Sequence, residues 1–309
     1  MELRNLRQFV AVAEERHVTR AARRLGMQQP PLSQAMRALE REVGAQLLRR
    51  LPRGVELTDA GRALLADARA ILAQVEHALA TTRRTARGEQ GRIAIGFTSS
   101  APFHPLVPRV VRAFREAHPR VSLSMEEGGS PELIDGLRNE RLDVVFARTD
   151  VSGASGVVVE TLLREPMLVA LPRAHRLARA ARGPIPLRAL ADETFIVYRR
   201  GSGPGLYDAI IAACQAAGFS PRIGQEAPRV TSTLNFVAAG LGVSIVPASL
   251  ARMRMDGIAY RAIRASGAPL AAALNLASRQ GDASAAVDRF VALAKQAAKK
   301  LKRGRGSAA

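Results

Sequence analysis

The 309-residue sequence predicts a multidomain α/β protein with a small helical domain first, one long helix next and a two-lobed strand–helix domain last. Three observations predict this order. Apolar residues recur every three or four positions through residues 1–43, which is typical of amphipathic helices. The same spacing continues without a break from residue 58 to about residue 87. From residue 92 onward, short apolar runs alternate with helical stretches, as they do in α/β sheets.

The first domain is predicted from two helices joined by a tight turn, with an earlier helix around Phe9 packed behind them. Thr19 can cap the short second helix, and Gly26 supplies the left-handed residue that ends it. The third helix begins near Pro30, because the fixed φ of proline suits a first turn. Two helices joined in this way form a helix-turn-helix. The inward apolar stripe of the third helix is Leu32, Met36, Leu39 and Val43.

The outward face of the third helix carries side chains that can hydrogen-bond base edges or phosphates. An ordinary solvated polar face is the alternative. The tight turn, the proline and the small residues Ala21 and Ala22 favour a recognition helix whose first turn enters the major groove of DNA. The residues expected to contact DNA from this motif are Thr19, Arg20, Gln29, Pro30, Ser33, Gln34 and Arg37.

The segment after the recognition helix predicts a small hairpin. Two extended pieces surround Pro52 and Gly54, which form a turn pair. Such a wing would bring Arg49, Arg50 and Arg53 beside the DNA backbone or into the adjacent minor groove. A solvated hairpin tip is the alternative, but three arginines in five residues beside this motif favour the wing.

A long helix is expected from its cap at Thr58 to about Arg87. Its apolar positions step by four, three, four and three residues, which is a heptad seam that needs a partner helix. A helix of about 29 residues spans about 43 Å and requires a second surface for stability in water. Dimerisation is the preferred interpretation, and folding back onto the second half of the chain is the alternative. The seam positions are Leu64, Ala68, Ile71, Val75 and Ala78.

The second half repeats one strand–helix scheme twice, which predicts two α/β lobes with mostly parallel strands and a cleft between them. The predicted strands are residues 93–97, 121–125, 143–147, 195–198, 222–225 and 243–247, and the crossing segments are 160–171 and 267–278. We place the domain boundaries at 1–57, 58–88, 92–162 with 268–300 (lobe I), 163–267 (lobe II), and 301–309 as a disordered basic tail.

Hydroxyl groups and glycines follow several of these strands, at the sheet edge where helix N-termini offer free N–H groups to a ligand. This arrangement suits a small carboxylate, and Arg148 could contact it with both arms of its guanidinium. For any single serine, a helix cap is the more common role. Taken together, these residues favour an effector-binding site. Its expected members are Ser99, Ser100, Ser130, Arg148, Ser202, Gly203, Pro204 and Thr231.

Composition restricts the remaining possibilities. The net charge of +19 favours a polyanionic partner, although the excess is spread over the chain. The single cysteine, Cys214, suits a reducing cytoplasm, and neither a signal peptide nor a membrane span is expected. The five histidines have no metal-ligand spacing, and no nucleophile, phosphate-loop or dinucleotide motif is present. We therefore expect no enzyme activity, catalytic residue, metal or cofactor.

Residues 1–62, with NLRQFVAVAEERHVTRAARRLGMQQPPLSQAMRALEREVGAQLLRR and RGVELTDAGRALL, resemble the DNA-binding domain of LysR-type bacterial transcriptional regulators. GFTSSAPFHPLVPRVVRAFREAHP, EEGGS and LNFVAAGLGVSIVPASL resemble the effector domains of the branch that controls aromatic-compound catabolism, whose inducers include muconate and benzoate-like carboxylates.

This resemblance implies a winged helix-turn-helix, a linker helix and a periplasmic-binding-protein-like effector domain. It implies binding to a partly palindromic double-stranded operator as a homodimer or homotetramer, contact with RNA polymerase, and an aromatic or dicarboxylic acid as effector. It places the inducer at Ser100, Ser130 and the turn Pro204, Gly205 and Leu206. The alternative is a two-lobed solute-binding protein or enzyme with an incidental basic N-terminal domain.

Overall fold

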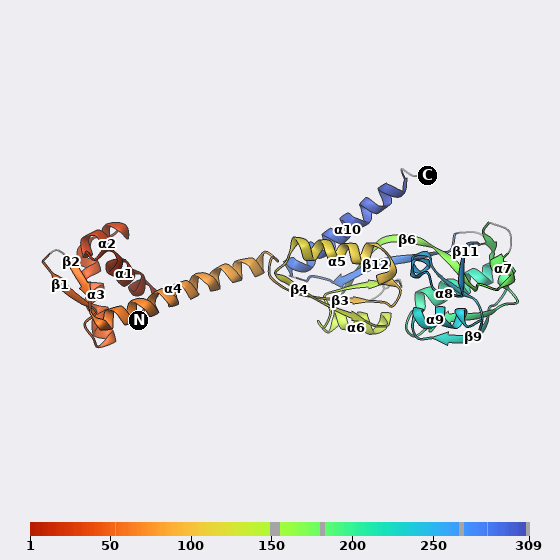
Figure 1. The fold of residues 1–309 in the computed structure, drawn as a ribbon, viewed down its shortest axis with the longest axis horizontal. Coiled ribbons are helices and arrows are strands. Elements are labelled where there is room, and N and C mark those ends of the chain that lie inside the picture. Colours follow the sequence, from red (N-terminus) through yellow and green to blue (C-terminus); the bar gives the residue numbers. More distant parts are fainter. Residues whose placement is uncertain (53, 149–154, 180–182, 266–268, 283, 307–309) are drawn as a thin grey trace. The chain divides into compact units, whose positions relative to one another are not determined.

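The computed structural model describes residues 1–52, 54–148, 155–179, 183–265, 269–282 and 284–306, with only the backbone for 304–306. The chain divides into two compact units, Met1–Arg84 and Thr85–Ala309 (Figure 1). Most of the predicted linker helix belongs to the first unit. Each unit has its own hydrophobic core and is described by itself.

The first unit is a helix-turn-helix with a wing and a long helix. Its core is formed by Leu6, Phe9, Leu32, Leu39 and Leu47, which are almost fully buried. The elements are α1 (Leu3–Glu15), α2 (Val18–Arg24), α3 (Gln29–Val43), β1 (Leu48–Leu51), β2 (Gly54–Leu57) and α4 (Asp59–Ala86).

The turn between α2 and α3 forms as expected at Gly26, which has a φ of 65°. The Met27 N–H donates to the Ala22 carbonyl over 3.0 Å, which closes the end of α2. Thr19 differs from the prediction, because α2 begins at Val18 and its N-cap is His17, two residues before Thr19. Val43 is 41% exposed and does not join the buried stripe, since it is the last residue of α3.

Helix α4 begins as predicted, with the Gly61 N–H donating to Thr58 Oγ1 over 2.9 Å. The predicted seam is wrong over its first turns. Ala68 is fully buried and Leu64 packs against the same N-terminal core, so both are used inside the unit. Beyond them, Ile71 is 38% and Leu79 is 45% exposed. The apolar surface that α4 leaves for a partner therefore begins near Ile71.

The second unit is built on a curved eight-stranded sheet with the order β4-β3-β5-β12-β6-β11-β7, in which β10 also pairs with β6. Strands β3, β4 and β5 are parallel, as predicted, whereas β12 pairs antiparallel with both β5 and β6. The crossing segments are thus strands of the sheet, and β6 serves both lobes. A second sheet of β8 and β9 completes lobe II.

The elements of lobe I are β3 (Gly91–Phe97), α5 (Leu106–Ala117), β4 (Val121–Glu127), α6 (Ser130–Arg138), β5 (Val144–Ala147), β12 (Ala271–Arg279) and α10 (Ala285–Gly306), with the first part of β6 (Val157–Pro172). Lobe II holds the rest of β6 with α7 (Arg176–Arg179), β7 (Ile185–Pro186), β8 (Thr194–Tyr198), α8 (Pro204–Ala216), β9 (Arg222–Ala227), α9 (Val230–Ala238), β10 (Ser244–Pro247) and β11 (Ile258–Arg264). Short 3-10 turns lie at Ala101–Phe103, Leu187–Leu190 and Ala248–Met253.

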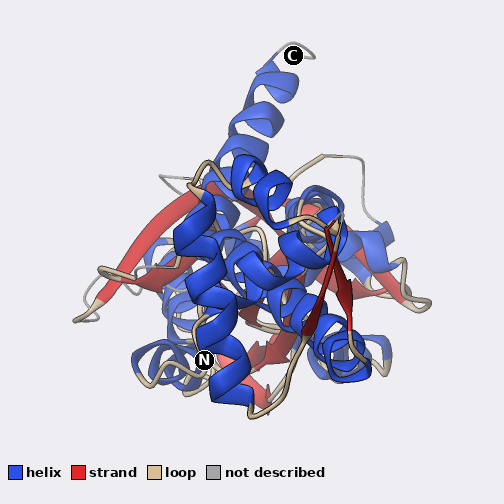
Figure 2. Cartoon of the chain, turned by 90° about the vertical axis from the view of Figure 1, so that its left-hand side faces the viewer, coloured by secondary structure: helices blue, strands red, loops and turns tan. Residues whose placement is uncertain are grey.

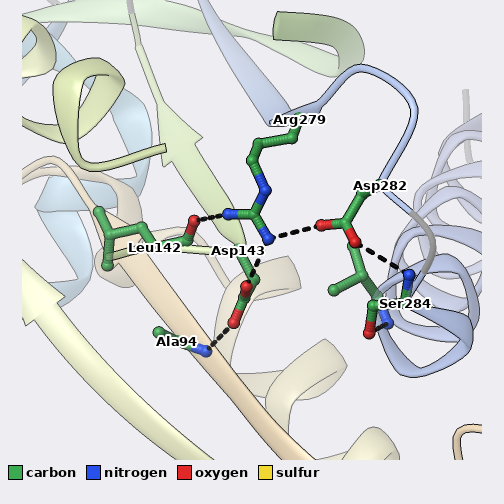
Figure 3. A network of polar contacts seen from close by, with 7 residues as sticks. Ala94, Leu142, Asp143, Arg279, Asp282 and Ser284 are labelled. Carbon is green, nitrogen blue, oxygen red and sulfur yellow. Dashed lines mark hydrogen bonds and ion pairs between the residues drawn. The ribbon is translucent and has the colours of Figure 1, made fainter. Parts of the chain in front are cut away.

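The end of lobe I away from the cleft is held together by Arg279 (Figure 3). Its guanidinium donates to the Leu142 carbonyl, to Asp143 Oδ1 over 2.8 Å and to Asp282 Oδ2 over 2.7 Å. Asp143 in turn accepts the Ala94 N–H over 2.7 Å. Burial alone would lower the pKa of Arg279, but the two carboxylates outweigh it and raise the pKa. The network joins β3, β5, β12 and the start of α10.

The predicted disordered tail, residues 301–309, is wrong for residues 301–306, because α10 continues to Gly306. Leu301 is partly buried against lobe I and extends the apolar stripe of Phe290, Ala294 and Ala298 by one turn. Figures 1 and 2 both show the last turns of this helix projecting from its lobe. Residues 307–309 lie outside the described chain. None of the described helices is both long enough and apolar enough to cross a membrane.

Candidate DNA-binding and effector-binding sites

The exposed face of α3 carries most of the polar residues expected to contact DNA. Gln29, Pro30, Gln34 and Arg37 are all exposed on or near its first turns. Ser33 differs from the prediction, because it is only 8% exposed. Gln29 Nε2 donates to Ser33 Oγ over 2.7 Å, so the amide covers the hydroxyl. A base edge can therefore reach Ser33 only after Gln29 moves.

Helix α2 presents the other two residues expected to contact DNA from the helix-turn-helix. Thr19 and Arg20 are both exposed in its first turn. Arg20 Nη2 donates to the Glu15 carbonyl over 2.7 Å, at the end of α1. This bond leaves the other N–H groups of the guanidinium available to a phosphate.

The wing is fixed to the helical domain at both ends. Its first strand starts where Glu40 Oε1 accepts the N–H groups of Leu47 and Leu48, over 2.9 and 3.1 Å. Its second strand is held by the Val55 N–H, which donates to the Arg16 carbonyl over 2.9 Å. A Cβ on Gly54 would lie 2.4 Å from that same carbonyl oxygen, so only glycine fits there.

Two of the three wing arginines lie within the described chain. Arg49 pairs with Glu56 across the hairpin over 2.5 Å, and this contact raises the pKa of Arg49 and lowers that of Glu56. Arg50 is exposed, with no ion pair among the described residues. Arg53, the third predicted wing contact, falls outside the described residues. Arg50 of the wing is therefore free to contact DNA directly. Arg49 can contact DNA only as one partner of an exposed ion pair.

The centre of the effector domain holds a buried guanidinium. Arg148 follows β5, is 4% exposed and lies 2.6 Å from Glu165 Oε1 on β6. Glu165 also accepts the Ser249 N–H over 2.6 Å and the Ser249 hydroxyl over 3.0 Å. Burial lowers the pKa of Arg148, and the carboxylate of Glu165 opposes that shift. The Arg148 head is thus held from one side by a charged partner.

Two other nitrogens of Arg148 have no hydrogen-bond partner in the part of the chain that the structure describes. Its Nε and Nη1 atoms are buried and lack hydrogen bonds, and so does Thr98 Oγ1. Arg148 and Thr98 line a cavity whose volume is about 200 Å³, including the solvent-filled space at its opening. The residues that line it are Thr98, Ser100, Ser130, Arg148, Tyr198, Ser202, Gly203 and Leu206. Five of the eight predicted effector residues therefore come together around one guanidinium.

The three other predicted residues do not line this cavity. Ser99 is 8% exposed, and its Oγ lies 2.9 Å from the Tyr198 hydroxyl of lobe II. Pro204 begins α8, directly after Gly203. Thr231 lies in the first turn of α9 and lines no described cavity, whereas Thr233, two residues later, does.

A second cavity of about 330 Å³ opens beside the first and shares Ser100, Tyr198 and Leu206 with it. Sequence reasoning missed this space, because its walls are ordinary apolar positions of two helices and a strand. The sequence feature that could have indicated this cavity is the segment VSIVP at residues 243–247, an apolar strand that carries a hydroxyl at Ser244. The further lining residues are Ile210, Val230, Thr233, Ser244, Ile245, Val246 and Pro247.

The two lobes contact one another directly at the cleft. The Ser130 N–H donates to the Ser202 carbonyl over 2.9 Å, and Arg229 pairs with Glu127 over 3.2 Å. A Cβ on Gly129 would lie 3.3 Å from Ser202 Cα, so glycine permits this close approach. Burial raises the pKa of Tyr198 above its ordinary value of 10. The two lobes are therefore in direct contact, an arrangement that we call the closed cleft.

A winged helix-turn-helix followed by a long helix and a two-lobed ligand-binding domain defines a DNA-binding transcriptional regulator that responds to an effector. Two family models match the chain, the bacterial regulatory helix-turn-helix protein of the lysR family over residues 3–62 and the LysR substrate binding domain over residues 86–299. The chain belongs to the LysR family of transcriptional regulators.

Two named regulators are similar in sequence to this chain over most of its length. The transcriptional regulator BudR of Raoultella terrigena is 37% identical over 94% of this chain and 99% of its own. The transcriptional regulator BenM of Acinetobacter baylyi is 35% identical over 84% of each chain.

Among solved structures, full-length CbnR in complex with its target DNA is 30% identical, with a TM-score of 0.83 over 96% of this chain and 100% of that one. The predicted fold class and the function as a DNA-binding regulator with an effector domain are confirmed. The alternative of a solute-binding protein or enzyme is wrong, because the matched relatives are transcriptional regulators.

Proposed function

We propose that the effector of this regulator is a small carboxylic acid with an apolar body, bound in the interlobe cleft with its carboxylate on Arg148. The observation that carries this proposal is that Arg148 Nε and Nη1 are buried and have no hydrogen-bond partner among the described residues. A buried donor left without a partner costs about 1–3 kcal/mol. A carboxylate recovers part of this free energy, because one of its oxygens can accept a charge-assisted hydrogen bond from Nη1 or from Nε.

The surrounding residues suit the same ligand class. Thr98 Oγ1 can donate to a carboxylate oxygen, and Ser100 and Ser130 line the same cavity. Glu165 occupies the opposite side of Arg148 and holds the guanidinium in place. The site therefore pairs one fixed cation with hydroxyl donors, which is how proteins orient a small anion within a mostly apolar pocket.

The neighbouring cavity favours an acid that has an apolar body. Leu206 and Ser100 belong to both cavities, while Ile210 and Val230 line only the second. An aromatic ring or a short unsaturated chain would extend from the carboxylate into this space. This agrees with the aromatic or dicarboxylic acids that the sequence resemblance implies. Both cavities are narrow, which favours a small effector.

The proposed mechanism couples cleft closure to the arrangement of the DNA-binding domains. A ligand shifts this equilibrium only as far as it binds the closed cleft more tightly than the open one. Copies of the chain joined through α4 as a homodimer or homotetramer would place paired recognition helices on a partly palindromic operator. Effector binding would change their placement and the contact with RNA polymerase in the cytoplasm, where transcription takes place.

The test is isothermal calorimetry of the full-length protein with benzoate, cis,cis-muconate and acetate, and with benzamide as the neutral control. We expect an aromatic or dicarboxylic acid to bind better than acetate, and benzamide to bind at least about tenfold more weakly than benzoate. Arg148→Lys keeps the charge but loses the planar set of guanidinium N–H donors, so it should weaken binding about 10–100-fold. Equal binding of benzoate and benzamide, or unchanged binding by Arg148→Lys, would refute the proposed site.

A further inference from the structure

Helix α10 contains every lysine of the chain. Only four of the 46 basic residues are lysines, at positions 295, 299, 300 and 302. Asp288 is the last acidic residue, so the 21 residues that follow it carry only basic and neutral side chains. Arginine is the basic residue everywhere else in the sequence. The end of this helix is therefore chemically distinct from the rest of the protein.

Two parts of α10 have different surroundings. Over its first turns, Phe290 and Ala294 are fully buried, and Phe290 packs on Phe114 of α5 with ring centroids 5.1 Å apart. Lys295 Nζ lies 2.5 Å from Glu160 Oε1 on β6. Beyond that ion pair, Ala298 and Leu301 still pack on lobe I, and the last turns of the helix project from the lobe (Figures 1 and 2). Its exposed cations there, which form no ion pair with the described residues, are Lys299, Lys300, Lys302 and Arg303.

This concentration of charge exceeds what the helix itself needs. The partial negative charge at a helix C-terminus favours nearby cations. Like charges three or four residues apart oppose one another, however, and Lys299 has such a relation to Lys295, Lys302 and Arg303. An external polyanion along this end would relieve the repulsion. The helical backbone holds the charges in a short row that can follow a line of phosphates.

We propose that the end of α10 is a second, sequence-independent contact with duplex DNA, in which Lys299, Lys300, Lys302 and Arg303 neutralise backbone phosphates. The chain already belongs to a family of DNA-binding regulators, so a duplex is the polyanion it meets when bound to an operator. Flexible lysine ammonium groups bind phosphates as point charges and read no base. The contact adds affinity without changing which operator is chosen. It does not depend on the identity of the effector.

The lysine distribution allows a direct test on the unmodified full-length protein. An amine-reactive acetylating reagent can label only the four lysines and the terminal amine. We expect a 60-base-pair duplex to slow labelling of Lys299, Lys300 and Lys302 at least threefold at low salt. Lys295 serves as the internal reference, because Glu160 already pairs with it. The protection should disappear at high salt, since counterions then compete for the phosphates.

Variants provide a second, independent measurement. K299Q/K300Q/K302Q/R303Q removes the four cations and keeps good helix-forming residues. R173Q/R179Q/R252Q/R254Q is the matched control, which removes four exposed arginines of lobe II that form no ion pair within the described structure. The α10 variant should weaken binding to a non-operator duplex and flatten the plot of log affinity against log salt by about 2–4 units. The control should leave the slope near that of the natural chain.

Each outcome decides the proposal. Protection by DNA together with a flatter salt dependence only in the α10 variant supports it. Labelling unchanged by DNA refutes it, as does an equal effect of both variants. Protection by purified RNA polymerase or by anionic vesicles, with none by DNA, also refutes it and assigns the basic end to that partner instead.

Discussion

Ser99 Oγ and the Tyr198 hydroxyl lie 2.9 Å apart and join the two lobes of the effector domain across the cleft. Both groups are largely withdrawn from solvent, and Tyr198 also packs on Gly203, where a Cβ would lie 2.5 Å from its Cε1 atom. The contact therefore depends on a loop of lobe I, the end of β8 and the start of α8. It closes the same cavity that Arg148 lines.

We predict that Tyr198→Phe loosens the closed cleft. The variant loses one hydrogen bond worth about 1 kcal/mol, which corresponds to about a fivefold shift towards open forms. Hydrogen–deuterium exchange should become faster at residues 98–101 and 198–204. Tyr207→Phe is the control, because Tyr207 lies on α8 of the same lobe and packs against the lobe II core. Equal exchange in natural protein and Tyr198→Phe would show that this bond does not hold the cleft closed.

The glycines of the same loop supply a matched pair of variants. Gly203→Ala should displace the Tyr198 ring and speed the same exchange, because its Cβ has no room. Gly201→Ala should have little effect, since nothing lies within 4 Å of its Cβ position. The pair separates steric displacement of Tyr198 from a general stiffening of the loop by alanine. Similar exchange in both variants would contradict the packing described.

Local pattern predicted much of this protein, and tertiary contacts account for the differences. Helix α3 and the Thr58 cap follow from spacing and from residue type at adjacent positions. Ser33 could not be predicted as buried, because a neighbouring Gln29 side chain covers it. Glu165 was not predicted at all, since its contact with Arg148 depends on how β6 crosses between the lobes. The spacing of apolar residues also cannot show what an apolar stripe packs against. Ala68 of the predicted heptad seam is buried in the core of its own unit and not against a partner helix.

We predict that Gly54→Ala detaches the wing from the helical domain. Gly54 has a φ of 139°, and its Cβ would lie 2.4 Å from the Arg16 carbonyl that accepts the Val55 N–H. The loss should be about 2–3 kcal/mol in local stability, from backbone strain plus the broken bond. Gel-shift titration at fixed salt should show weaker operator binding. Gly26→Ala is the control, because it has a positive φ but open space around its Cβ. An equal loss in both variants would rule out the clash at Arg16.

We predict that Ile71→Glu prevents association through α4, since it places a charge on the exposed apolar stripe. Light scattering of the purified variant should give a smaller mass than the natural chain. Ala70→Glu, one position away on an exposed part of the same helix, should leave the mass unchanged. Ala68→Glu should instead destabilise the N-terminal unit, because Ala68 is fully buried there. An unchanged mass for Ile71→Glu would place the subunit interface elsewhere.

The position of α4 against α1 and α2 depends on Glu14, and this contact should weaken in acid. Glu14 Oε1 accepts from Arg69 Nη2 of α4 over 2.8 Å, and Glu14 Oε2 lies 2.9 Å from Arg24 Nη1 of α2. Hydrogen bonds from Arg69 and Arg24 lower the pKa of Glu14 below its ordinary 4.5. A carboxyl with a lowered pKa in the folded state stabilises that state above its unfolded pKa. This contribution is lost as the pH falls through the folded-state value, hence below about 4.5.

Glu14→Gln should therefore reduce the local stability of the N-terminal unit by up to about 1 kcal/mol at pH 7, a small value because both arginines are half exposed. The difference from the natural chain should shrink at pH 3, because the lower pH favours protonation of the natural carboxyl. Hydrogen exchange of α1 and α2 in urea at both pH values measures it. Glu76→Gln is the control, since Glu76 is exposed and lies 3.8 Å from Arg7. A difference that persists unchanged at pH 3 would mean that Glu14 acts through packing and not through its charge.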